Sequence, residues 1–93
     1  MTDAETAFTI EWAPSAIRTL ERLPEKVAAA AIEFIYATLA LNPHRAGHPL
    51  RFELEGLHSA RRGDHRIIYR IDEEAHRVIV VVIQHRSDVY RRR

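Results

Sequence analysis

The 93-residue sequence contains no cysteine, a single lysine, three glycines and four prolines. Without cysteine there are no disulfides, thiolate metal sites or cysteine nucleophiles. With 46% hydrophobic and 29% charged residues, the composition is neither collagen-like nor that of a disordered chain. No apolar run, that of Val78 to Ile83 included, approaches the ~18 residues that suggest a membrane span. A chain of this length has room for one core and hence one domain.

Arginine supplies 13 of the 14 basic side chains, and Lys26 is the only lysine. The net charge of +1 argues against a general polyanion binder. The charge is distributed unevenly, however. Residues 1–60 carry five cations and eight anions, net −3, whereas residues 61–93 carry nine cations and five anions, net +4. The basic C-terminal third is therefore the first functional clue.

The chain is expected to divide into a flexible N-terminus at residues 1–7, one domain at residues 8–90 and a basic tail at residues 91–93. The N-terminus is acidic and lacks the basic-then-apolar order of a signal peptide. We therefore expect a cytoplasmic protein without a membrane partner.

The first half of the chain predicts a short strand and a helical hairpin. Residues 8–12 alternate apolar and polar side chains, which is the period of a strand. A short helix is expected between Pro14 and Pro24, because proline suits the first turn of a helix and stops the helix before it. A longer helix is expected over residues 25–41, where apolar residues recur at helical spacing, and Asn42-Pro43 should end it.

The second half predicts strands. After an expected loop at residues 44–49, the apolar period changes to two, and Gly56 interrupts the alternation of Leu50, Phe52 and Leu54. Three strands are expected, at residues 57–62, 66–71 and 77–84, joined by turns at Gly63-Asp64 and at residues 72–76. The order β-α-α-β-β-β predicts an α+β fold, with the helical hairpin on one face of a mainly antiparallel four-stranded sheet.

Alternation along residues 66–71 sorts the side chains between the two faces of the sheet. The apolar set should meet the helices, and it comprises Ile67, Tyr69 and Ile71. Arg66, Ile68 and Arg70 should then project from the other face. The sequence therefore predicts a concave basic platform on the face without helices.

The six histidines, at positions 44, 48, 58, 65, 76 and 85, do not form a metal-binding pattern. His44 and His48 are four residues apart, but the surrounding prolines and glycine argue against a helix, and no His-Glu-x-x-His motif exists. Gly56 and Gly63 do not make a phosphate-binding loop, and the serines lack a nucleophile signature. No metal and no other cofactor is therefore expected.

A basic cluster near the C-terminus has the side chains that RNA backbone chemistry requires. Its members are Arg61, Arg62, Arg66, Arg70, His85, Arg86 and Tyr90. Arginine offers a planar fork that matches phosphate, histidine exchanges a proton near neutral pH, and tyrosine stacks on a base or donates a proton. The composition leaves a second interpretation open, a solvated basic face with ion pairs to Asp64, Asp72 and Asp88.

Two segments resemble the signatures of the RelE/ParE toxin superfamily. Residues 57–69, LHSARRGDHRIIY, are similar to its RxGxYRxxY signature, and residues 83–90, IQHRSDVY, to its C-terminal HR..VY signature. The N-terminal order of strand, short helix and long helix also fits, so the resemblance covers residues 8–90. It is closer to the RelE branch than to the ParE branch.

The resemblance implies a toxin of a type II toxin–antitoxin module. Such a toxin would be a metal-independent endoribonuclease that cuts mRNA in the ribosomal A site. The 2′-hydroxyl of the mRNA would attack the neighbouring phosphate, and the cut would produce a 2′,3′-cyclic phosphate. The implied partners are a RelB-like antitoxin, mRNA on the ribosome, and operator DNA only through the antitoxin complex. Two alternatives stay open: a ParE-like, non-enzymatic poison of DNA gyrase, and a weakly active homologue that mainly binds antitoxin.

Matched by position, the resemblance implies that Arg66 stabilises transition-state charge and that Arg61 contacts phosphate. His85 and Arg86 match a basic pair of which one member acts in proton transfer or leaving-group stabilisation, and Tyr90 matches a tyrosine that stacks on or orients the nucleotide. These five are the expected catalytic residues. The expected substrate-binding residues are Arg62, Arg70 and His58.

The sequence departs from the family pattern at three positions. Leu57 and Ser59 stand where some RelE-like enzymes carry lysines, and His65 stands where a tyrosine is common. Without those lysines, the general base is assigned to His85, because an imidazole titrates near neutral pH, and His58 is the second choice.

Overall fold

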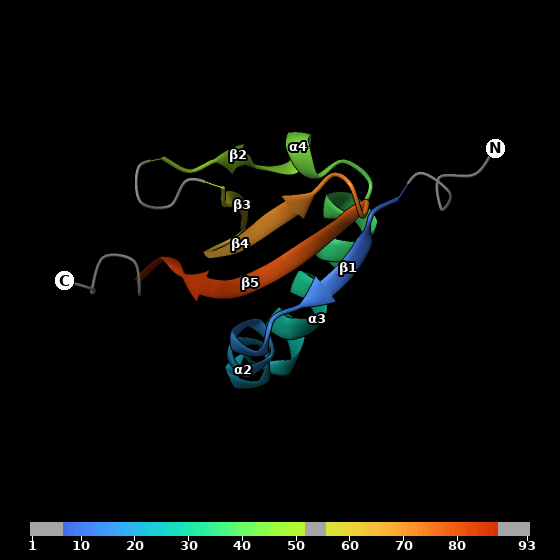
Figure 1. The fold of residues 1–93 in the computed structure, drawn as a ribbon. Helices are drawn as coiled ribbons and strands as arrows, with labels where there is room; N and C mark the ends of the chain where they lie inside the picture. Colours follow the sequence, from blue (N-terminus) through green and yellow to red (C-terminus); the bar gives the residue numbers. More distant parts are fainter. Residues whose placement is uncertain (1–6, 52–55, 88–93) are drawn as a thin grey trace.

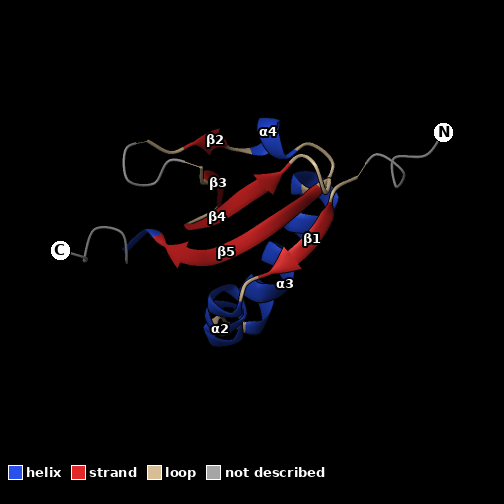
Figure 2. Cartoon of the chain, in the orientation of Figure 1, coloured by secondary structure: helices blue, strands red, loops and turns tan. Residues whose placement is uncertain are grey.

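The computed structural model describes residues 7–51 and 56–87. The elements, in chain order, are β1 (Thr9–Trp12), α2 (Pro14–Arg22), α3 (Glu25–Phe34), the π-helix η1 (Ile35–Leu39), α4 (Pro43–Ala46), β2 (His48–Pro49), β3 (His58–Arg62), β4 (His65–Asp72) and β5 (Arg77–His85). The hairpin of α2 and α3 packs on one face of the sheet (Figures 1 and 2). Within residues 7–51 and 56–87, no helix combines the length and the apolar character needed to cross a membrane.

The strands form one mixed sheet in the order β1-β5-β4-β3-β2. β1 runs parallel to β5, and all other neighbours are antiparallel. This confirms the predicted α+β fold, but the predicted strand number of four is one too low. The additional strand β2 has two residues and pairs with β3 at the sheet edge. A strand this short leaves no periodicity that a sequence could reveal.

Proline delimits the helical hairpin as predicted. Pro14 lies in the first turn of α2, and Pro24 is the N-cap of α3. α3 continues into η1, where the N–H of Ala40 donates to the carbonyl of Ile35 at 2.8 Å, five residues back. The long helix predicted over residues 25–41 is therefore an α-helix followed by one π-helical turn.

The segment predicted as a loop at residues 44–49 contains two short elements, α4 and β2. η1 ends at Leu39, and Asn42 starts α4, because its side chain accepts a hydrogen bond from the N–H of Arg45 at 3.3 Å. Leu50 belongs to no strand, and its N–H donates to the carbonyl of Leu57 at 2.8 Å. Phe52 and Leu54, predicted to alternate with it, lie outside the described residues.

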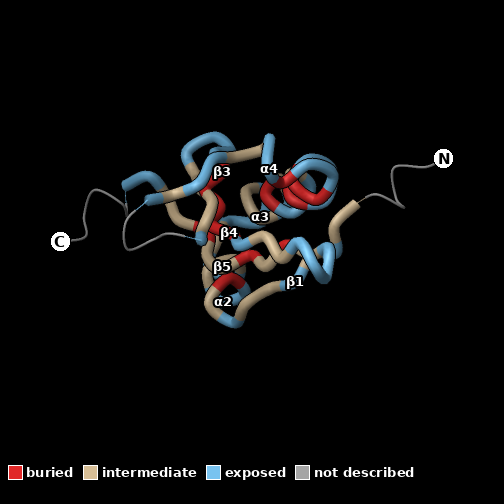
Figure 3. Tube along the Cα trace, turned by 45° about the horizontal axis from the view of Figure 1, so that its top comes forward, coloured by how far each residue is buried: buried red, intermediate tan, exposed pale blue. Residues whose placement is uncertain are grey.

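The core lies between the hairpin and the sheet, where the buried residues concentrate (Figure 3). The helices contribute Ala16, Ala31, Ile35 and Leu39, and the strands contribute Ala60, Ile67, Tyr69, Val78, Val80 and Ile83. On β5 the buried positions change parity after Val80. The register with β4 shifts there and leaves Val81 as a bulge.

Helix α2 secures the C-terminal half of β5. Strand β1 pairs with β5 only as far as Val80, so the remaining edge of β5 needs other partners. Ser15 supplies one, since its hydroxyl donates to the carbonyl of Val81 at 2.6 Å. Thr19 supplies another, since its hydroxyl accepts from the N–H of Ile83 at 3.2 Å. These contacts fix the end of β5 that precedes the predicted site residues.

Candidate nucleic-acid interface

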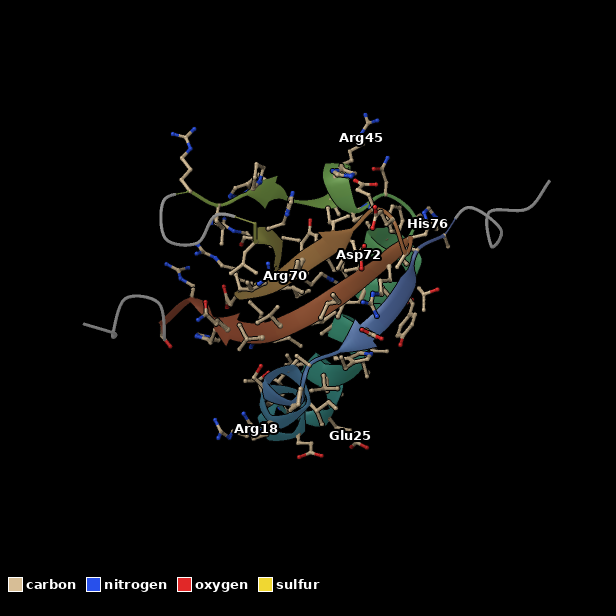
Figure 4. All side chains as sticks on the ribbon, in the orientation of Figure 1. Arg18, Glu25, Arg45, Arg70, Asp72 and His76 are labelled. Atoms are coloured by element: carbon tan, nitrogen blue, oxygen red, sulfur yellow. The ribbon has the colours of Figure 1, made fainter. Side chains whose placement is uncertain are left out.

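Strand register brings three of the predicted arginines to one face of the sheet. Arg61 on β3 lies directly opposite Arg66 on β4, beside the Gly63-Asp64 turn. Arg70 has the same parity as Arg66 further along β4, and it is exposed on the sheet, away from Arg18 of the hairpin (Figure 4). We call Arg61, Arg66 and Arg70 the arginine face. It is the face without helices, as the alternation predicts.

The structure adds Gln84 to this face. Gln84 of β5 lies opposite Arg66, so that Arg61, Arg66 and Gln84 form a row across three strands. Sequence reasoning missed this residue, because it ends a β-branched run whose parity is visible only once the bulge at Val81 is known. Its side-chain amide both donates and accepts hydrogen bonds, which suits phosphate, sugar or base contacts.

Within residues 7–51 and 56–87, the structure contains no ion pair of Arg61, Arg66 or Arg70. Guanidinium groups without carboxylate partners raise the local positive potential. They also keep their paired N–H donors available for the oxygens of a phosphate. The arginine face is therefore electrostatically prepared to bind an anion.

This face is less open than the sequence suggests. Ile68 and Ser59 point to the same side as the arginines by register, yet they are only 7% and 3% exposed. The chain near Gly56 lies beside Arg70, because a Cβ atom at Gly56 would be 3.4 Å from the Nη1 of Arg70. The three arginines of the arginine face therefore surround a centre, at Ser59 and Ile68, that is shielded from solvent.

His85 lies on the other face. It pairs with His65, one residue beyond the pair of Arg66 and Gln84, and so it shares the helix side with Ile67. The two imidazoles meet edge-on, with ring centroids 4.9 Å apart and an interplanar angle of 83°. Because His85 is the last residue of β5, it reaches the end of the sheet where the two faces meet.

The hydrogen bonds of His85 define its tautomer. The backbone N–H of Ser87 donates to the Nδ1 of His85 at 3.0 Å, and the hydroxyl of Ser87 lies 2.8 Å from the same nitrogen. A nitrogen that accepts an N–H bond carries no hydrogen, so the neutral ring has its hydrogen on Nε2. In this form the free nitrogen donates a hydrogen bond, whereas a general base needs a free nitrogen that accepts one.

Arg86 closes the same end of the sheet. Its backbone N–H donates to the carbonyl of Asp64 at 2.8 Å, and its guanidinium lies 3.9 Å from the carboxylate of Asp64. Both side chains are exposed, so this ion pair contributes little and leaves Arg86 available to a ligand. Tyr90, the fifth predicted catalytic residue, lies outside the described residues.

Two of the predicted substrate-binding residues are separated from the arginine face. Arg62 pairs with His65 and faces the helix side, next to α3. His58 pairs with Tyr69 three residues before Arg61, about 10 Å along the strand. The ring of His58 stacks on Tyr69 with centroids 5.4 Å apart. In the described part of the chain, its Nδ1 atom is buried without a hydrogen-bond partner.

The other histidines do not converge on a metal position. Among the described residues, no group of three or more potential protein ligands is arranged to hold a metal ion.

Comparison with known proteins identifies the class. Residues 10–90 match the family model described as the ParE toxin of the type II toxin–antitoxin system parDE. The chain belongs to this toxin family, within the RelE/ParE superfamily, and the resemblance seen in its motifs is confirmed.

Its named relatives place it more narrowly. Toxin RelE of Mycobacterium tuberculosis is 58% identical over 77 residues, which are 83% of this chain and 79% of that protein. Toxin RelG of the same bacterium is 45% identical over 85 residues, 91% of this chain and 98% of that protein. The crystal structure of the M. tuberculosis toxin–antitoxin complex RelBE2 matches with a TM-score of 0.84 and 43% identity, covering 88% of this chain and 94% of that one. The chain is therefore a RelE-like toxin of a type II system.

Proposed function

We propose that this toxin is a metal-independent endoribonuclease that cleaves mRNA in the ribosomal A site. The observation that carries the proposal is the arginine face, where Arg61 and Arg66 lie opposite each other and have no carboxylate partner in the described part of the chain. A phosphodiester gains negative charge as it becomes pentacovalent. Preorganised donors aimed at that charge are usually the largest single contribution to catalysis.

In the proposed reaction, the 2′-oxygen of the mRNA forms a bond to phosphorus while the bond from phosphorus to the 5′-oxygen breaks. Arg61 and Arg66 contact the non-bridging oxygens and stabilise their charge. The Nε2–H of His85 hydrogen-bonds to the departing 5′-oxygen and stabilises its charge, which agrees with the hydrogen bond from Ser87 to Nδ1. The departing 5′-oxygen takes its proton from water. The 2′-hydroxyl proton passes to water, and the products are a 2′,3′-cyclic phosphate and a 5′-hydroxyl.

We also propose that a RelB-like antitoxin neutralises the toxin in the cytoplasm and that operator DNA is bound only through the complex of the two proteins. The supporting observation is that the similar M. tuberculosis structure is that of a toxin–antitoxin complex. The ParE name of the family model keeps a second candidate function, a non-enzymatic poison of DNA gyrase. The identity to proteins named RelE and RelG favours the nuclease over this candidate and over a weakly active homologue.

The test is cleavage of a defined mRNA by the purified toxin in the presence of translating ribosomes, with cut positions read by primer extension. Arg66→Ala should lower the cleavage rate by about 10²- to 10³-fold, the usual effect of removing one donor to transition-state charge. Arg18→Ala is the matched control, because Arg18 is an exposed arginine of α2 far from this face (Figure 4). It should cleave like the unmodified toxin.

Two results would contradict the proposal. One is growth arrest without any mRNA cleavage, and if DNA damage accompanied that arrest, the gyrase candidate would take its place. The other is an Arg66→Ala variant that cleaves as fast as Arg18→Ala.

A further inference from the structure

A hollow lies on the helix side of the β3–β4 turn, behind the arginine face. It has a volume of about 300 Å³, at the small end of ligand pockets. Its wall on α3 includes Lys26, Val27 and Ala30, and its wall on the sheet includes Arg62, His65 and Ile67. A pocket of this size accepts one or two side chains rather than a whole element.

The pocket combines an aliphatic floor with a basic rim. Val27, Ala30 and Ile67 supply apolar surface, whereas Lys26 and Arg62 are exposed at its edge. Among the described residues, neither of these cations has an ion-pair partner.

The pocket also contains one carboxylate, that of Asp64, which lies 3.9 Å from the guanidinium of Arg86. Lys26 and Arg62, which have no ion-pair partner in the described part of the chain, outnumber this carboxylate, so the rim attracts an acidic partner.

We infer that this pocket receives an apolar side chain of the antitoxin, held beside an Asp or Glu of the antitoxin that pairs with Lys26 and Arg62. The inference rests on the proposed function, because it specifies the chemistry of the partner proposed there. A protein segment fits better than RNA. The floor is aliphatic, and the one ring in the wall, His65, already packs edge-on against His85. An amphipathic segment with an acidic residue next to an apolar anchor matches both the apolar floor and the basic rim of the pocket.

The occupant would lie on the back of the turn that carries the arginine face. Arg62 lines the pocket, whereas Arg61, its neighbour in the chain, points to the opposite side with Arg66. The antitoxin segment in the pocket would therefore hold the toxin without covering the phosphate-binding arginines.

The single lysine allows a direct test. The toxin is co-expressed with its proposed RelB-like antitoxin, and the purified complex is treated with a carbodiimide, which joins an amine to a carboxylate that it contacts. Lys26 is the only side-chain amine of the toxin, so mass spectrometry should find it joined to an Asp or Glu of the antitoxin. Lys26→Arg keeps the charge but removes the amine, so it should abolish this cross-link and leave the affinity unchanged.

Affinity measurements test the pocket independently. Lys26→Glu should weaken antitoxin binding about tenfold. Arg18→Glu, an exposed charge reversal on α2, should leave the affinity as it is. Ala30→Trp, which fills the pocket, should also weaken binding about tenfold. Ala29→Trp is the control on the adjacent exposed position of the same helix. Thermal unfolding of each variant checks that the fold is intact.

The outcomes separate this inference from the proposed function. If the complex forms but Lys26→Glu and Ala30→Trp bind as tightly as their controls and Lys26 is not cross-linked, the pocket assignment is wrong and the antitoxin partner stands. If Lys26→Glu slows mRNA cleavage without affecting antitoxin affinity, the pocket binds RNA and the inference is overturned. If the unmodified toxin forms no complex, the antitoxin part of the proposed function fails, and this inference fails with it.

Discussion

Arginine has opposite roles in two regions of the sheet. Near the β4–β5 turn, Arg77 donates to Asp72 at 3.1 Å and to Glu11 of β1 at 2.9 Å, so its charge is neutralised within the fold. On the arginine face, Arg61 and Arg66 have no carboxylate partner among the described residues. This difference distinguishes an arginine that stabilises the fold from arginines that remain available to a ligand.

Some polar groups around Tyr69, like Arg77, are bound within the fold and contrast with the available arginines of the arginine face. We call Pro43, Gly47, His58 and Tyr69 the closed end of the molecule. The hydroxyl of Tyr69 donates to the carbonyl of Pro43 at 2.6 Å, and burial raises the pKa of Tyr69 to about 12, which keeps it a neutral donor. Because the fold uses the hydroxyl of Tyr69 and the carbonyl of Pro43, changes at the closed end should alter stability, whereas changes on the arginine face should alter activity.

Arg61→Ala offers the largest contrast. It removes a donor that has no carboxylate partner among the described residues, so mRNA cleavage should fall about 10²- to 10³-fold, while the free energy of unfolding stays within about 0.5 kcal/mol. Cleavage assays and urea unfolding on the same preparation check both parts. Arg61→Lys keeps the charge but loses the planar fork, so its cleavage rate should lie between those of the unmodified toxin and Arg61→Ala. A large loss of stability in Arg61→Ala would show that Arg61 is a structural residue.

Gly47→Ala should have the largest effect on stability. An added Cβ atom would lie 2.6 Å from the hydroxyl oxygen of Tyr69 and closer still to the carbonyl oxygen of Ser59, and the backbone atoms of Ser59 cannot move aside easily. Such overpacking costs about 2 to 3 kcal/mol of unfolding free energy. Gly63→Ala is the control, because nothing lies within 4 Å of its added Cβ and only its φ of +63° causes strain. Equal losses at both glycines, measured by urea unfolding, would contradict the close contact at Gly47.

Tyr69→Phe should have a smaller effect. It leaves the buried carbonyl of Pro43 without its donor, which costs about 1 to 2 kcal/mol of unfolding free energy. Tyr36→Phe is the matched control, since the hydroxyl of Tyr36 accepts a hydrogen bond from the Nε1 of Trp12 at an exposed position. Its stability should hardly change. Cleavage per folded molecule should be normal in both variants, and a loss specific to Tyr69→Phe would extend the active site to the closed end.

The arginine face was predictable from sequence because its signals are local. Alternation along β4 separates Arg66 and Arg70 from Ile67 and Tyr69, and the Gly63-Asp64 turn fixes the register that brings Arg61 opposite Arg66. Both signals rest on the period of two that a strand imposes on its side chains.

The side of the sheet that His85 occupies was not predictable. Its adjacency to Arg86 grouped it with the arginines, but its face depends on the bulge at Val81, which a run of Val and Ile on both parities conceals. The closed end escaped prediction for a related reason. The hydrogen bond between Tyr69 and Pro43 joins residues 26 positions apart, and no local pattern encodes it.

The pH dependence of stability completes the comparison. Burial, with the neighbouring His44 and His48, lowers the pKa of His58 below its ordinary value of 6.5. As the pH falls below 6.5, the unfolded chain takes up a proton that the folded His58 resists, so the stability present above that pH is progressively lost.

His58→Phe isolates the contribution of this histidine. Phenylalanine keeps an aromatic ring against Tyr69 but cannot titrate, so the fall in Tm between about pH 7.5 and about pH 5 should be shallower than in the unmodified toxin. Calorimetry across this range measures the difference in slope. A variant whose Tm follows the same pH profile as the unmodified toxin would show that His58 is not the titrating group at the closed end. A variant that also lost cleavage at neutral pH would place His58 in the active site, where the sequence first put it.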